Sequence, residues 1–176
     1  LSALLGEKYD IAGKATGEAM LISPVGNGEL GLTLDLLVED SWLGGHNAGT
    51  IIASSEWDDE TKTMGVKLKS VMDGRSPLSI DGSFSPSSRN INAEASLDSF
   101  DAGYFGSLAS SVFSKLEGKV SGNFQVNGTP DKLSISNSDG RIEGGLLQIA
   151  YTGVPYYMDG SFMVNYRGVF FNDVNV

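Results

Sequence analysis

The chain has 176 residues, of which 22 are acidic and 12 are basic, and its formal net charge is −10. Its lysines and arginines are scattered, which makes nucleic acid and anionic lipid head groups poor partners because both require concentrated positive charge. The sequence contains no cysteine, which excludes disulfides, thiolate chemistry and cysteine-based zinc sites.

Apolar residues make up 40% of the sequence, which predicts one folded domain over residues 1–176 rather than a disordered chain. No stretch of about 18 apolar residues is present, so no membrane-spanning helix is predicted. The chain begins at Leu1 without a charged and then apolar signal segment. We therefore expect it to be a fragment of a much longer protein.

Alternating apolar and polar residues recur from the N-terminal half onward. Because successive side chains of a β-strand point to opposite faces, each such run predicts a strand with one apolar and one wet surface. The apolar residues of the first clear runs are Leu30, Leu32, Leu34 and Leu36, then Leu78, Ile80 and Phe84, then Ile91, Ala93, Ala95 and Leu97. Each run ends at Gly, Asn, Asp or Pro, which is typical of an antiparallel meander.

One segment has a different period. Between residues 104 and 116 the apolar residues are spaced by three, four and eight positions, as on one face of a helix of about three turns. Asp101 before the segment is a suitable N-terminal cap, and Gly118 after it is a suitable stop. We expect the only helix of the chain here.

The next block, residues 116–135, reads LEGKVSGNFQVNGTPDKLSI. Val120, Gly122, Phe124 and Val126 alternate with polar residues and predict a strand. The run ends at residues 127–130, where Asn-Gly tolerates positive φ and proline cannot donate to a sheet ladder. A second strand is predicted over residues 132–136, and a later strand carries Phe162, Val164 and Tyr166.

Together these runs predict an all-β fold of about ten to twelve strands. The alternation alone is equally typical of a closed β-sandwich or barrel. Many apolar-face positions hold glycine or alanine, and aromatic residues are only 9% of the chain. These features favour an open, strongly curved sheet over a wide closed core.

The order of the elements from the first alternating pair to the last strand resembles the C-terminal region of the TamB family, the AsmA-like proteins of the translocation and assembly module. The repeat unit of that family matches Gly118, Ser121, Gly122, Phe124, Val126, Gly128 and Thr129. Pro130 follows Thr129 directly, where the family commonly has a longer loop. The match is good over residues 89–176 and weaker over residues 1–88, where residues 11–19 fit best.

The resemblance implies an elongated antiparallel sheet folded lengthwise into a trough, a β-taco, with an apolar interior. It implies a periplasmic protein anchored in the inner membrane, with an outer-membrane barrel of the Omp85 class, similar to TamA, as partner. It further implies a part in lipid transport, outer-membrane biogenesis and protein secretion, with phospholipid acyl chains or nascent outer-membrane proteins as clients.

A trough needs no catalytic residue and no cofactor, because an apolar surface alone shields an acyl chain from water. We expect a groove lined by the apolar residues of the alternating runs: Leu32, Leu34, Leu36, Ile80, Phe84, Ile91, Leu97, Val120, Phe124, Val126, Phe162 and Val164. Two alternatives stay open. One is a strand-binding scaffold for barrel or autotransporter insertion, because open sheets have edges that accept strands. The other is a closed structural or adhesive β domain.

Enzyme activity is not expected. His46 is the only histidine, and we expect it to lie in a solvent-facing loop, where it can build neither a metal trio nor a triad. The acidic residues Asp58, Asp59 and Glu60 lack the oxygen-rich spacing of a calcium loop and indicate a solvated turn. Gly26 and Gly28 lack the third glycine and the helix of a phosphate-binding loop. No metal site is predicted.

Overall fold

A computed structural model describes residues 11–22, 31–43, 45–105, 113–165 and 167–175 of the chain. These residues form ten β-strands and one short 3-10 helix, η1. The strands are β1 (Ile11–Ile22), β2 (Gly31–Leu43), β3 (His46–Asp58), β4 (Thr63–Met72), β5 (Arg75–Ser85), β6 (Asn90–Asp101), β7 (Phe113–Thr129), β8 (Lys132–Ile149), β9 (Pro155–Asn165) and β10 (Gly168–Asn175), and η1 is Ala102–Phe105.

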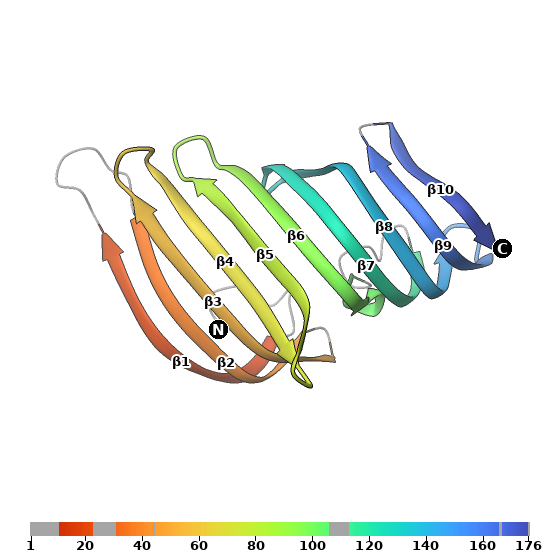
Figure 1. The fold of residues 1–176 in the computed structure, drawn as a ribbon, viewed down its shortest axis with the longest axis horizontal. Helices are drawn as coiled ribbons and strands as arrows, with labels where there is room; N and C mark the ends of the chain where they lie inside the picture. The colour runs from red at the N-terminus through yellow and green to blue at the C-terminus, as the bar shows by residue number, and fades with distance from the viewer. Residues whose placement is uncertain (1–10, 23–30, 44, 106–112, 166, 176) are drawn as a thin grey trace.

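All ten strands belong to one antiparallel sheet in which each strand pairs with the next along the chain. Figure 1 shows a single layer with β1 at one end and β10 at the other, and β1 and β2 bow along their length. The sheet is neither closed nor strongly curled, so the expectation of an open sheet is confirmed and that of strong curvature is wrong. The prediction of an all-β antiparallel meander is confirmed, whereas the closed sandwich or barrel is not what the described residues form.

The strand register puts apolar side chains on a common face of the sheet. Directly opposed residues of antiparallel strands lie on the same side of the sheet. One row of such neighbours crosses the sheet from β2 to β10 through Val38, Ile51, Ser70, Leu78, Leu97, Gly122, Gly140, Phe162 and Phe171. We call the side that contains this row the apolar face and the other side the polar face.

The predicted break in the 116–135 block is the turn of a β-hairpin. β7 extends to Thr129, which pairs with Lys132, so Pro130 and Asp131 form a two-residue connection. The short strand predicted over residues 132–136 is only the start of β8, which continues to Ile149. Two long paired strands therefore replace one medium and one short strand.

The prediction of a three-turn helix over residues 104–116 is wrong. In the part of the chain that the structure describes, this region contains only the 3-10 turn η1, and β7 begins at Phe113. Leu116 opposes Leu147 of β8, so its burial comes from sheet pairing. The two ends of the predicted helix are therefore a 3-10 turn and a strand, and residues 106–112 between them lie outside the described residues.

Two glycines of the sheet differ in what they require of the backbone. Gly122 has φ of +148°, and a Cβ there would collide with the backbone carbonyl oxygen of Asp139 on β8. Gly65 on β4 has no such constraint, because a Cβ there would lie 3.7 Å from the nearest atom, the carbonyl oxygen of Glu56.

We predict that Gly122→Ala lowers the free energy of unfolding by about 1–3 kcal/mol, because alanine rarely adopts positive φ and the paired strand must move. Gly65→Ala should change it by less than about 0.5 kcal/mol. Chemical denaturation followed by circular dichroism measures both. Equal effects of the two substitutions would contradict the tight approach of β7 and β8 at Gly122.

Candidate functional site

The register places all the predicted groove residues on the apolar face. Eleven of them are partly buried and Phe124 is buried, with 7% of its surface exposed. Their cross-strand neighbours are mostly small or apolar, as in the pairs Phe84–Ile91, Ala95–Phe124 and Gly140–Phe162. Phe124 also stacks near Phe162, with ring centroids 6.1 Å apart.

Sequence reasoning missed part of this face because polar residues interrupt the alternation on β3 and β4. Serines at positions 55 and 70 stand in the apolar rows of these strands. The residues that share the face but were not included in the predicted groove are Val38, Ile51, Trp57, Met64, Val66, Leu68, Leu78, Leu133, Ile135 and Ile142. Leu78, Leu133 and Ile135 belong to strands that the alternation predicted. The signal that could have found β3 is the run from Ile51 to Trp57, in which Ile51, Ala53 and Trp57 stand at alternate positions and only Ser55 interrupts them.

The buried serines do not make the apolar face polar. Ser41 Oγ donates to the carbonyl of Gly49 at 2.7 Å, Ser55 Oγ to that of Leu32 at 2.9 Å, and Ser70 Oγ to that of Ala48 at 2.7 Å. Each hydroxyl is thus satisfied by backbone, and a satisfied buried hydroxyl carries no desolvation penalty. The surface offered to a ligand is therefore mainly carbon.

An apolar cavity of about 260 Å³ lies on this face. Its lining residues are Leu36, Val38, Ser41, Trp42, Ala48, Ile51, Ala53, Leu68, Ser70, Leu78, Phe100 and Tyr104. Tyr104 of η1 stacks on Phe100 with ring centroids 4.8 Å apart, and its hydroxyl donates to the carbonyl of Asn47. The short turn that replaces the predicted helix thereby forms one wall of the cavity.

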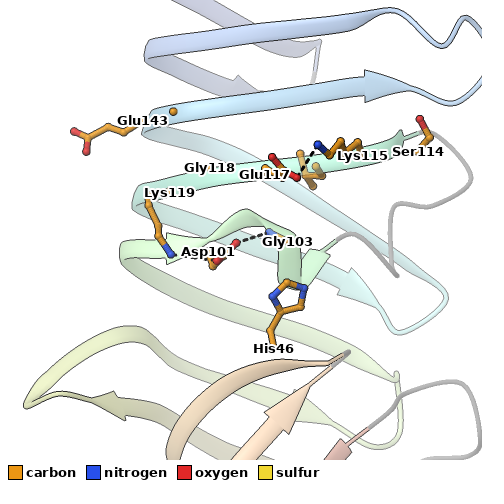
Figure 2. Close-up of a pocket in the computed structure, with 11 residues that line it drawn as sticks. His46, Asp101, Gly103, Ser114, Lys115, Glu117, Gly118, Lys119 and Glu143 are labelled. Carbon is orange, nitrogen blue, oxygen red and sulfur yellow. Dashed lines mark hydrogen bonds and ion pairs between the residues drawn. The ribbon is translucent and has the colours of Figure 1, made fainter.

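A second, charged pocket of about 650 Å³ lies at the start of β7 (Figure 2). Its lining residues are His46, Asp101, Gly103, Ser114, Lys115, Leu116, Glu117, Gly118, Lys119, Glu143 and Gly144. Lys119 pairs with Asp101 at 3.1 Å and Lys115 with Glu117 at 3.0 Å. His46 and Glu143 lie at opposite ends of the pocket in Figure 2.

Asp101 and Tyr104 are the perturbed groups near these cavities. Partial burial disfavours the charged form of Asp101, but hydrogen bonds from the Gly103 N–H and Lys119, together with the Lys119 charge, outweigh it and hold its pKa below 3.8. Burial, with a smaller contribution from the Asp101 charge, raises the pKa of the Tyr104 phenol above 10.0. At neutral pH the carboxylate is charged and the phenol is neutral.

The prediction that His46 lies in a solvent-facing loop is wrong. It is the first residue of β3, is partly buried, and lies against the ring of Tyr104 with centroids 5.1 Å apart. Within the described ranges, no three histidine or acidic side chains gather closely enough to hold a metal ion. The same ranges hold no helix long and apolar enough to cross a membrane.

The acidic residues 58–60 form a turn between β3 and β4. Asp58 accepts hydrogen bonds from the Glu60 N–H and from the Thr61 hydroxyl, both at 2.8 Å, and Asp59 accepts one from the Trp57 indole at 3.0 Å. The carboxylates are thus used within the turn. Gly26 and Gly28 lie outside the described residues.

The lowered pKa of Asp101 predicts a pH-dependent stability. Because the folded pKa is lower than the unfolded one, the carboxylate contributes stability above about pH 4, which is lost as the pH falls through the folded pKa. Asp101→Asn keeps an acceptor for Gly103 and removes the charge. We expect it to cost about 0.5 kcal/mol at pH 7 and less near pH 2, measured by denaturation at both values. A difference that grows toward low pH would contradict the sign.

Comparisons of the chain with protein-family models, with curated proteins and with solved structures found no match. The apolar face and the cavities beside it are therefore the structural observations on which a function can be proposed.

Proposed function

We propose that the chain is a non-enzymatic segment that shields phospholipid acyl chains from water on the apolar face of its sheet. The observation that carries the proposal is the row of apolar and small residues that crosses the sheet from β2 to β10, with no second layer over it among the described residues. A soluble domain normally buries such a face against another element. Here an acyl chain would be the covering element.

The free energy of moving an acyl chain out of water favours the proposal that the apolar face shields it. Each buried methylene contributes about 0.8 kcal/mol, so moving a sixteen-carbon tail from water to an apolar surface is worth about 12 kcal/mol. The glycines and alanines of the face, such as Gly82, Ala93 and Gly122, carry no side chain beyond a Cβ. Width and continuity of the surface are all that this function requires.

We further propose that the sheet is one stretch of a shallow trough whose inner surface is the apolar face. The bowed strands β1 and β2 in Figure 1 support a concave shape at that end. The resemblance of residues 89–176 to the TamB family supports a periplasmic location, an anchor in the inner membrane and an Omp85-class barrel as partner. In that setting the segment would contribute to phospholipid transport to the outer membrane.

A second candidate is a strand-binding scaffold for outer-membrane proteins. The observation that favours it is that, among the described strands, β1 and β10 each pair on one side only. Such edges present free backbone N–H and C=O groups that another strand can pair with.

Photo-crosslinking tests which face meets lipid. Ile80 and Ile135 lie on the apolar face, and their sequence neighbours Asp81 and Ser134 lie on the polar face. With the purified chain and vesicles of phosphatidylethanolamine and phosphatidylglycerol, crosslinkers at positions 80 and 135 should capture lipid and those at 81 and 134 should not. Equal capture at all four positions, read by mass spectrometry, would refute the acyl-chain proposal.

A charge on the apolar face separates the two candidates. Ile135 is 44% exposed, so Ile135→Glu should fold, and Ser134→Glu is its control on the opposite face. We expect Ile135→Glu to reduce bound lipid at least about fivefold, because a carboxylate beside an acyl chain loses hydration, while the control keeps it. Lipid binding would be measured by extraction. Unchanged lipid in both variants, with binding of an unfolded barrel protein, would favour the strand-binding scaffold.

A further inference from the structure

A third pocket lies beside both the apolar cavity and the charged pocket. It has a volume of about 180 Å³ and is lined by residues that include Met72, Pro77 and Ser99. It shares Ser70, Phe100 and Tyr104 with the apolar cavity, and His46, Asp101 and Lys119 with the charged pocket. The three spaces are thus neighbours, and their linings change from aliphatic side chains in the first to charged side chains in the last.

This order matches the chemistry of an amphipathic molecule, whose tail needs an apolar wall and whose head needs charges. The charged end contains both signs. Asp101, Glu117 and Glu143 contribute three carboxylates, and Lys115 and Lys119 contribute two ammonium groups. A head group that carries one phosphate and one ammonium would find a partner for each charge.

The existing ion pairs at this end are exposed enough to exchange partners. The side chains of Lys119 and Asp101 are 53% and 36% exposed, and those of Lys115 and Glu117 are 50% and 54% exposed. Exposed pairs are weak, so a ligand can replace one at small cost. Lys119 can then turn to a phosphate while Asp101, still held by the Gly103 N–H at 2.9 Å, accepts a hydrogen bond from the ligand's ammonium.

We propose that these neighbouring pockets select phospholipids with a zwitterionic head group that bears a primary ammonium, with Lys119 at the phosphate and Asp101 at the ammonium. The proposal rests on the proposed function, because the tail occupies the apolar cavity. An anionic head group would meet three carboxylates in a chain of net charge −10. A quaternary ammonium has no N–H to donate to Asp101.

The experiment offers the purified 176-residue chain vesicles with equal parts of phosphatidylethanolamine, phosphatidylglycerol and phosphatidylcholine. Native mass spectrometry then identifies the bound lipids. We expect phosphatidylethanolamine to be enriched about threefold to fivefold over each of the others, the size that one or two exposed ion pairs provide.

Substitutions of Asp101 and Lys119 test whether the preference for phosphatidylethanolamine depends on the charged pocket. Asp101→Asn and Lys119→Gln should lose the enrichment and bind the three lipids in the ratio offered, and Lys119→Arg should keep the preference. Lys67→Gln is the matched control, because Lys67 makes an exposed ion pair with Asp81 at 3.9 Å on the polar face of β4 and β5. It should behave as the unaltered chain, and circular dichroism verifies the fold of each variant.

The outcomes separate the head-group inference from the proposed function. Lipid bound in the ratio offered, or a preference that survives in both Asp101→Asn and Lys119→Gln, overturns the inference and leaves acyl-chain shielding intact. Loss of all lipid by a folded Lys119→Gln also overturns it, because the charge would then maintain the cavity rather than select the head. No lipid on the unaltered chain refutes both.

Discussion

Strand register is the constraint on which the rest of the structure depends. A slip of one residue in any pairing would turn the apolar side chains of the following strands to the opposite face. The row from Val38 to Phe171 shows that every pairing from β2 to β10 is in phase. The apolar cavity, the stack of Tyr104 on Phe100 and the charged pocket at the sheet end exist only while this phase is kept.

β-bulges maintain the phase where simple alternation fails, and three of them share one feature. In each of these three bulges, two residues three positions apart lie on the apolar side, although alternation would place them on opposite sides. The pairs are Val38 and Ser41, Leu97 and Phe100, and Ile142 and Gly145. An extra residue with positive φ stands inside each bulge, at Asp40, Ser99 and Gly144. An extra residue of this kind shifts the alternation by one position and bends the strand.

These bulges mark how far the sequence could predict the fold. Unbroken runs such as Ile91–Leu97 and Val120–Val126 predicted both the strand and its apolar side. Beyond a bulge the period-two pattern changes phase, so the ends of β6 and β8 were invisible to it. The helix prediction failed for another reason, because it joined apolar residues of η1 and of the start of β7 into one period although they belong to different elements.

The candidate site also has a part that the sequence predicts and a part that it does not. The apolar residues of the face follow from alternation, which is a local property of one strand. The charged pocket joins residues from β3, β6, β7 and β8, and its pairing of Lys119 with Asp101 follows only from the sheet order. The contact of His46 with Tyr104 could not be predicted for this reason, because the two residues are far apart in the sequence.

The meander also determines how the domain gains its stability. Because each of the ten described strands pairs only with its neighbours in sequence, the free energy of this sheet divides into a chain of local interfaces, as in repeat proteins. Short sequence separations lower the entropic cost of forming each interface, so the sheet can assemble one hairpin at a time. Unfolding would then begin at β1 or β10 and proceed inward, and strands could be gained or lost at these ends without rebuilding the interfaces between them.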